Sequence, residues 1–233
     1  MKISILIPVF NEKNTILKIL EKVNIEKKKF DLQIVVSDDG SNDGTVEILK
    51  NNDHLYDKII YKNKNEGKGS AVIEGIKVST GEYLLVQDAD LEYSPNDYTQ
   101  LFKPIENDAD AVYGSRFKGS EPKRIIYFLN RVANFLITFL VNCLTNINFS
   151  DVETGYKLVK TDLLRKIDLQ EKTFAFEVEL TMKLSKLKIK FYEVGINYNG
   201  RRYEDGKKIR LKDGFIAIYK IFYYFFLNKY FKF

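Results

Sequence analysis

The chain has 233 residues, with 37 lysines and arginines against 32 aspartates and glutamates, which gives a formal net charge of +5. This length suits one α/β domain with a full core, and a hydrophobic content of 45% excludes a largely disordered chain. The single cysteine, Cys143, excludes an intramolecular disulfide, and the single histidine, His54, excludes a zinc site built from several Cys and His ligands. The N-terminus enters a strand pattern directly, so we predict no secretory signal.

The positive charge is concentrated at the C-terminus. Residues 201–233 carry nine basic and three acidic side chains, so this segment has a charge of +6 and the preceding 200 residues sum to −1. A uniformly basic surface is therefore excluded, and with it the argument for nucleic-acid binding from net charge. We expect no nucleic-acid partner.

Apolar runs alternate with helix-like segments over the first half of the chain. Strands are predicted at Ile3–Val9, 32–37, Lys58–Tyr61, 83–87 and 111–113, and helices at 15–23, 45–50 and 70–78. This alternation is typical of βαβ units and predicts an α/β fold with a mainly parallel sheet. The strand runs are continuously apolar, as in strands buried on both faces, so helices are expected on both sides of the sheet.

The pattern changes in the second half. We predict a long helix at 124–144, a further helix at 174–187 and a strand at 191–198. Asn134, Thr138 and Asn142 recur every four residues and place a polar stripe on an otherwise apolar helix. The apolar stretch of that helix spans about 20 Å, less than the roughly 30 Å hydrocarbon core of a bilayer, so we expect no transmembrane helix.

Polar or glycine-rich motifs follow the predicted strands. In an open α/β sheet, ligands bind outside the carboxyl ends of the strands, so these motifs are expected to share one site. They are Asn11-Glu12, Asp38-Asp39-Gly40-Ser41, Gly67-Lys68-Gly69, Asp88-Ala89-Asp90-Leu91-Glu92 and Gly114-Ser115-Arg116.

Asp88, Asp90 and Glu92 alternate along the chain, as side chains leaving a strand do. Carboxylates converging on one side suit Mg²⁺ or Mn²⁺ shared with a substrate phosphate. The alternative interpretation is a solvated acidic turn, and the aspartates and glycine of 38–41 are equally typical of a turn. The glycines of 67–69, ahead of a helix, offer backbone N–H groups to a phosphate. The ordered combination is more specific than any one motif.

Taken in order, the motifs resemble the inverting glycosyltransferases of family 2, which have the nucleotide-sugar-binding GT-A fold. The resemblance extends to Ile7-Pro8-Val9-Phe10, Asn42-Asp43-Gly44-Thr45 and Asn65-Glu66, and it covers essentially the whole chain. Within the family, the chain looks most like the dolichyl- or polyprenyl-phosphate sugar synthases. The resemblance therefore implies transfer of a hexose from a UDP- or GDP-sugar to a polyprenyl phosphate.

The resemblance also implies roles for the matching side chains. The nucleotide would be bound by Pro8, Phe10, Glu12, Asp38, Asp39, Lys68 and Asp88. Asp88 and Asp90, helped by Glu92, would bind the Mg²⁺ or Mn²⁺ that neutralises charge on the leaving nucleoside diphosphate, which makes Asp90 a catalytic residue. Glu92 departs from the glutamine often found at this position in the mannosyl enzymes.

Two classes of acceptor are compatible with the sequence, a lipid phosphate and a hydroxyl group. A lipid phosphate is already an anion and needs mainly cations to position it. The candidate cations are Arg116, Arg131, Arg202 and Lys208, although the basic stretch at 200–208 is also typical of a solvated loop. A hydroxyl acceptor, on a glycan or a cell-surface polysaccharide intermediate, would instead need a general base. Glu177 and Glu179 are the candidates for that base.

The C-terminal segment 213–233 combines aromatic and basic residues. Ten aromatic side chains lie between 215 and 233, with lysines among them. Such a segment is typical of an amphipathic helix at a membrane interface, and it is too charged and too short to span a bilayer. The alternative is a helix packed on the domain's own core.

From this segment and the resemblance we predict a catalytic domain at 1–212 with a C-terminal amphipathic segment at 213–233. The protein is expected in the cytoplasm, peripheral at the inner face of the membrane. The partners would be the nucleotide-sugar donor, the polyprenyl-phosphate acceptor and the membrane surface, and a separate membrane-spanning partner is left open.

Two other classes of protein are weighed against this prediction. A nucleotidyltransferase is also α/β and dependent on aspartates and a metal, but its glycine-rich phosphate loop should follow the first strand. This chain has Pro8-Val9-Phe10-Asn11-Glu12 there instead. A non-catalytic lipid-binding module would leave Asp88 and Asp90 dispensable.

Overall fold

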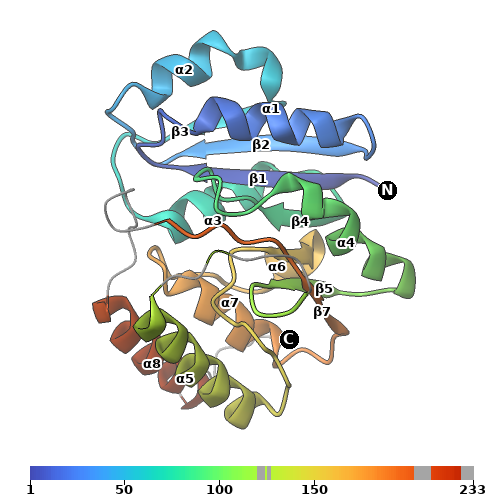
Figure 1. Cartoon of the computed structure of the whole chain (residues 1–233), viewed down its shortest axis with the longest axis vertical. Helices are drawn as coiled ribbons and strands as arrows, with labels where there is room; N and C mark the ends of the chain where they lie inside the picture. The colour runs from blue at the N-terminus through green and yellow to red at the C-terminus, as the bar shows by residue number, and fades with distance from the viewer. Residues whose placement is uncertain (120–123, 125–126, 202–210, 227–233) are drawn as a thin grey trace.

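The computed structural model describes residues 1–119, 124, 127–201 and 211–226, within which strands and helices alternate along the chain (Figure 1). The strands are β1 (Ile3–Val9), β2 (Leu32–Asp38), β3 (Lys58–Tyr61), β4 (Tyr83–Val86), β5 (Ala111–Ser115), β6 (Lys157–Lys160) and β7 (Phe191–Gly195). The α-helices are α1 (Ile16–Lys27), α2 (Thr45–Asn51), α3 (Lys68–Val78), α4 (Tyr98–Phe102), α5 (Phe128–Thr145), α6 (Thr161–Lys166), α7 (Phe176–Leu184) and α8 (Leu211–Phe226).

The strands form one seven-stranded sheet in the order β3-β2-β1-β4-β6-β5-β7. Strand β6 runs antiparallel to both of its neighbours, β4 and β5, and the remaining pairs are parallel. All strands except β6 therefore point the same way, and their carboxyl ends meet at one edge of the sheet. The predicted α/β fold with a mainly parallel sheet is confirmed.

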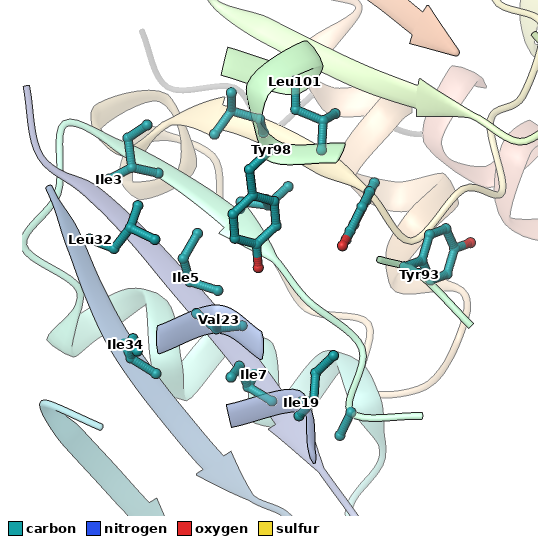
Figure 2. Packing of buried hydrophobic residues seen from close by; sticks show 14 of the residues in the cluster. Ile3, Ile5, Ile7, Ile19, Val23, Leu32, Ile34, Tyr93, Tyr98 and Leu101 are labelled. Atoms are coloured by element: carbon teal, nitrogen blue, oxygen red, sulfur yellow. The ribbon is translucent and has the colours of Figure 1, made fainter. Parts of the chain in front are cut away.

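Helices cover both faces of the sheet, which explains the continuously apolar strands. On one face, Ile5 and Ile7 of β1 pack against Ile19 of α1, in the cluster drawn in Figure 2. On the other face, Leu6 packs with Val72 of α3. Because successive side chains of a strand point to opposite faces, both sets of β1 residues lose their contact with water. The central strands thereby form a rigid base for the loops at their ends.

Helix α8 packs against α5 and α7, and in Figure 1 it lies beside α5 at the lower left. Ala217, Ile221 and Tyr224 of α8 are buried in these contacts. The outer sides of α5 and α8 remain exposed and strongly apolar. This α5–α8 apolar face consists of Phe128, Leu129, Phe135, Leu136, Phe139, Phe215, Ile216, Tyr219, Phe222, Tyr223 and Phe226.

The polar stripe of α5 faces the protein together with two apolar residues, and a second set of apolar residues faces outward. Asn134, Ile137, Thr138 and Val141 are buried, whereas Phe135 is 64% exposed and Phe139 is 57% exposed. The helix therefore has apolar side chains both on the core and on its outer side. By length and composition alone, α5 is long enough to cross a membrane, and only 22% of its 18 residues are buried within the fold. Our expectation that it does not cross one stays a prediction.

The second half of the chain departs most from the predicted elements. Strand β6 and helix α6 were not predicted there, and α5 begins at Phe128 rather than at 124; in the first half, helix α4 was not predicted. Strand β7 ends at Gly195 instead of 198 because the chain then leaves the sheet, and Tyr198 forms an isolated bridge with Tyr93. That bridge brings the segment after β7 onto the 88–92 motif.

Candidate active site

A cavity of about 740 Å³ lies at the carboxyl edge of the sheet and gathers most of the predicted site residues. Its walls include Pro8, Phe10, Glu12, Asp39, Lys68, Asp88, Asp90, Glu92, Arg116, Arg131 and Glu177. Asp38 lines an adjoining hollow of about 640 Å³, which shares Phe10 and Asn65 with the larger cavity. Arg202 and Lys208 lie outside the described residues.

The two adjacent aspartates after β2 have different surroundings. The carboxylate of Asp39 accepts hydrogen bonds from the Gly67 backbone N–H at 2.6 Å and from Nζ of Lys62 at 2.5 Å, so it holds the loop ahead of α3. Oδ2 of Asp38 accepts from the backbone of Gly40 and Ser41, but its Oδ1 is buried without a hydrogen-bond partner. Asp38 therefore keeps an acceptor for a ligand, whereas Asp39 shapes the pocket.

All three carboxylates of the 88–92 motif line the cavity, but Glu92 is bound by other parts of the chain. Strand β4 ends at Val86, and Leu91 has a φ of +64°, so the chain turns between Asp90 and Glu92. The Glu92 carboxylate instead accepts from the Tyr198 hydroxyl at 2.8 Å and from the Arg201 backbone N–H. Across the described parts of the chain, no three Asp, Glu, His or Cys side chains are grouped as metal ligands.

Asp88 and Asp90 nevertheless suit a divalent cation. Burial, together with the neighbouring charges of Asp88 and Glu92, raises the pKa of Asp90 to about 7. Nζ of Lys68 lies 2.7 Å from Oδ1 of Asp88, so a lysine ammonium group contacts this carboxylate in the structure. Mg²⁺ sites that handle phosphates commonly use one or two carboxylates, with phosphate oxygens and water as the other ligands. The Asp88–Asp90 pair fits such an ion bound together with a diphosphate.

Arg201 also lines the cavity, beside Asp90 and Glu12. It was not among the individual site residues predicted from the sequence. Its Nε donates to the carbonyl oxygen of Asp90 at 2.9 Å, and its Nη2 lies 3.1 Å from Oε2 of Glu12. The segment following β7 is thus held against Glu12 and the backbone of Asp90. The basic run from Arg201 to Lys208 pointed to this segment, but adjacent arginines cannot be told apart without the backbone path.

Arg116 and Arg131 also line the cavity and differ in their partners. Arg116 makes a two-point contact with Asp151, with Nε to Oδ2 at 2.8 Å and Nη2 to Oδ1 at 2.7 Å, so its charge is already balanced. Arg131, near the start of α5, is exposed and lies over the ring of Phe117 at 5.4 Å. No ion pair joins Arg131 to another described residue. Its guanidinium is therefore available to an anionic ligand.

Comparison with known proteins identifies the family. A model of Glycosyl transferase family 2 matches residues 4–168, which include β1 to β6 and the motifs that line the cavity. The chain belongs to this family. The family predicted from the ordered motifs is therefore confirmed.

Two curated relatives of this glycosyltransferase are lipid-phosphate sugar transferases. Dolichol-phosphate mannosyltransferase of Pyrococcus furiosus is 28% identical over 214 residues, which are 90% of this chain and 61% of that protein. Dolichyl-phosphate beta-glucosyltransferase of Dictyostelium discoideum is 27% identical over 215 residues, which are 84% of this chain and 66% of that protein. The chain therefore spans less than two thirds of the length of each.

A solved structure shows the same fold. Glucosyl-3-phosphoglycerate synthase from Mycobacterium tuberculosis matches with a TM-score of 0.74 at 16% sequence identity, over 96% of this chain and 80% of that one. That synthase has been solved in complex with Mn²⁺ and uridine diphosphate. The predicted GT-A fold of the glycosyltransferase is confirmed.

Glu177, one of the two candidate bases, lies in the cavity between two lysines. It is 3.1 Å from Nζ of Lys68 and 2.5 Å from Nζ of Lys157. Burial acts to raise the pKa of Glu177, but the charges of Lys157 and Lys68 outweigh it and hold the pKa below its usual value. A carboxylate stabilised as the anion is a weak proton acceptor, so Glu177 is poorly suited to act as a general base.

Glu179, the other candidate, faces away from the cavity. Its carboxylate is fully buried, accepts from the backbone N–H groups of Gln170 and Glu171, and lies 2.6 Å from Nζ of Lys183. The Tyr224 hydroxyl of α8 donates to the same group at 3.0 Å. Glu179 therefore joins α7, the preceding loop and α8, which is a structural role.

Glu179→Ala is accordingly expected to destabilise the fold. The change removes one member of a buried ion pair, so Lys183 loses its carboxylate partner and keeps only the carbonyl oxygen of Asp168, and two backbone N–H groups lose their acceptor. This costs about 3–5 kcal/mol in the free energy of unfolding. Urea denaturation followed by circular dichroism measures this loss, with Glu21→Ala at an exposed position of α1 as the control. If Glu179→Ala left the stability unchanged but abolished turnover, Glu179 would return as a candidate base.

Proposed function

We propose that this glycosyltransferase moves a hexose, with inversion at the anomeric carbon, from a UDP- or GDP-sugar to a polyprenyl phosphate. The proposal includes Mg²⁺ or Mn²⁺ held by Asp88 and Asp90, where the ion would neutralise charge on the leaving diphosphate. The two relatives named for dolichyl-phosphate substrates support this acceptor class. The synthase complex with Mn²⁺ supports the metal.

The observation that carries the proposal is the set of residues that line the cavity. One and the same cavity is lined by the carboxylates of Asp88 and Asp90, by Arg131, and by Phe128 and Ala217 on α5 and α8. A phosphate carried on a long apolar chain needs both features together, a cation for its head and an apolar surface for its tail. The α5–α8 apolar face supplies that surface next to the cavity.

The surroundings of the two candidate general bases favour a phosphate acceptor over a hydroxyl acceptor. A hydroxyl must lose its proton during attack, whereas a phosphate anion is already a nucleophile. Glu177 is held as an anion by two lysines, and Glu179 faces away from the cavity. The exposed Arg131 suits an anion instead.

We further propose a peripheral association with the inner face of the cytoplasmic membrane. Contiguous exposed apolar surface of this extent marks an interaction site, and helices with aromatic rings and lysines lie at the interface of bilayers. In this proposal residues 1–212 are the catalytic domain and 213–233 the amphipathic segment. A separate membrane-spanning subunit remains compatible with it.

A donor and acceptor panel tests the proposed reaction. The protein is incubated with Mn²⁺, UDP- and GDP-sugars and a short polyprenyl phosphate, and lipid-linked sugar is scored by mass spectrometry. The matched control is the corresponding polyprenol without phosphate. Product from the phosphate alone is expected; labelling of the polyprenol or of a glycan would favour the hydroxyl acceptor, and donor hydrolysis alone would contradict both.

Vesicle flotation tests the membrane contact. The double variant Phe135→Glu with Phe139→Glu is expected to reduce binding to anionic lipid vesicles at least about tenfold, because two exposed rings can no longer be buried in the interface. The control is Ile25→Glu on α1, which is 54% exposed and outside the α5–α8 apolar face. Equal flotation of the double variant and the wild type would contradict the proposed contact.

A further inference from the structure

Two side chains in the wall of the cavity have buried polar atoms without hydrogen-bond partners. Nδ2 of Asn134 on α5 and Oε1 of Glu153 in the loop before β6 are both buried, and neither has a hydrogen-bond partner among the residues that the structure describes. Asn134 is only 6% exposed. Unsatisfied buried polar atoms are rare in native proteins and demand an explanation. Here one is a hydrogen-bond donor and the other an acceptor, and both belong to the same cavity.

The orientation of the Asn134 amide follows from its other contact. Nη2 of Arg116 donates to Oδ1 of Asn134 at 3.4 Å, and Arg116 has no acceptor to offer in return. The oxygen of the amide must therefore face Arg116, so the NH₂ group is the part left without a partner. Arg116 itself is fixed by Asp151, two residues before Glu153.

The segment from Asp151 to Gly155 crosses from the acceptor side of the cavity to the donor side. At its start, Asp151 holds Arg116, and the backbone N–H of Val152 donates to Thr138, one turn beyond Asn134 on α5. At its end, a Cβ added to Gly155 would lie 2.5 Å from Oδ2 of Asp88. Glu153 thus lies between the donor-side carboxylates and the acceptor-side arginines.

Group transfer requires the migrating sugar to occupy that intermediate position. The leaving diphosphate lies on one side of the anomeric carbon and the attacking acceptor on the other. A sugar hydroxyl both donates and accepts hydrogen bonds, so it satisfies a free acceptor such as Oε1 of Glu153 and a free donor such as Nδ2 of Asn134. A diphosphate or a lipid phosphate has no hydrogen to give to Glu153 and would be repelled by its anionic form.

We propose that Glu153 and Asn134 form the subsite that recognises hydroxyl groups of the transferred hexose, and that Glu153 disfavours donors whose sugar carries a carboxylate. The inference rests on the proposed function only in that the donor is a nucleotide hexose, and it is independent of the acceptor. Burial, opposed by Lys157 and reinforced by Glu177, raises the pKa of Glu153 to about 7. Such a carboxyl hydrogen bonds to hydroxyls in either protonation state, which suits the role.

Calorimetry with two ligands separates sugar recognition from a structural role. UDP-glucose and GDP-mannose are titrated in the presence of Mn²⁺, each beside the matching nucleoside diphosphate, into wild type, Glu153→Gln, Glu153→Ala and Asn134→Ala. The exposed Glu21→Gln on α1 is the matched control. For the donor that binds wild type, Glu153→Ala is expected to weaken nucleotide-sugar binding at least about tenfold, with binding of the diphosphate changed less than about twofold. Glu153→Gln should lie between Glu153→Ala and wild type.

Deoxy donors add a test of direct contact. A nucleotide sugar that lacks the hydroxyl read by Glu153 should bind wild type and Glu153→Ala about equally, because the two changes remove the same hydrogen bond. UDP-glucuronic acid should bind wild type more weakly than UDP-glucose, and Glu153→Gln should narrow that difference. The thermal midpoint of ligand-free Glu153→Gln is expected to equal or exceed that of wild type, since burial disfavours the charge of Glu153 more than Lys157 and Arg116 favour it.

Three results would overturn the inference. Equal weakening of nucleotide-sugar and diphosphate binding would make Glu153 structural. Loss of turnover with unchanged nucleotide-sugar affinity would make it a general base, and unchanged binding in every variant would leave it without a role. Failure of the acceptor panel with a normal donor preference would contradict the polyprenyl-phosphate proposal alone, so the two failures are distinguishable.

Discussion

Asp90→Asn is expected to lower the rate of sugar transfer at least about 10³-fold while leaving the protein folded. The substitution keeps the shape of the side chain and an oxygen that can accept the hydrogen bond from the Glu92 backbone N–H, which is 3.0 Å away. It removes the negative charge that, beside Asp88, would hold a divalent cation against the diphosphate. Initial rates with Mn²⁺ at saturating donor measure the effect.

The stability of this variant distinguishes a catalytic loss from unfolding. The pKa of Asp90 is raised to about 7 by burial and by the charges of Asp88 and Glu92, so its ionised form is disfavoured in the fold. Because asparagine carries no charge, the thermal midpoint of Asp90→Asn above pH 7 should equal or exceed that of wild type. Asp162→Asn, at an exposed surface carboxylate, is the control for both measurements. Full transfer by Asp90→Asn with metal present would contradict the assignment of the site.

The fold of the first half could be predicted because strands β1, β2 and β4 are buried on both faces and alternate with helices along the chain. The runs at Ile3–Val9 and Lys58–Tyr61 agree with the structure at both ends, although β3 lies at the edge of the sheet and is only partly buried. Strand β6 could not be found in this way. It is four residues long, has a lysine at each end, and owes its place to pairing with β4 and β5. Its strand character is a property of the tertiary structure.

The site was predictable to the extent that it follows strand ends. Side chains after β1, β2, β4 and β5 meet because parallel strands deliver them to one edge of the sheet. The orientation of Glu92 was not predictable, since it depends on the left-handed backbone of Leu91 and on Tyr198 from beyond β7. Asn134 belongs to the polar stripe predicted for α5, whereas no predicted site motif includes Glu153. What makes them functional candidates, unsatisfied burial, is visible only once their neighbours are in place.

Arg131→Ala is expected to reduce transfer to a polyprenyl phosphate about 30- to 100-fold, chiefly through the acceptor. A charge-assisted contact between an arginine and a phosphate contributes about 2–3 kcal/mol, and the guanidinium is held over the Phe117 ring in a position to supply it. Because Arg131 is exposed and forms no ion pair with another described residue, its removal leaves no buried charge unpaired. The fold should therefore be unaffected. Arg116→Ala, in contrast, would leave the buried carboxylate of Asp151 without its ion-pair partner and so destabilise the fold.

The decisive measurement for Arg131→Ala is whether the substitution impairs use of the acceptor or binding of the donor nucleotide. The KM for the polyprenyl phosphate should rise or kcat should fall, while the affinity for nucleoside diphosphate with Mn²⁺ stays within about twofold of wild type. Arg131→Lys should recover part of the activity, since it restores the charge without the two-pronged geometry of the guanidinium. Arg165→Ala, at a surface arginine of α6 outside both cavities, is the matched control. If Arg131→Ala weakened diphosphate binding as much as acceptor use, the arginine would belong to the donor site, and the order of groups along the cavity would have to be reversed.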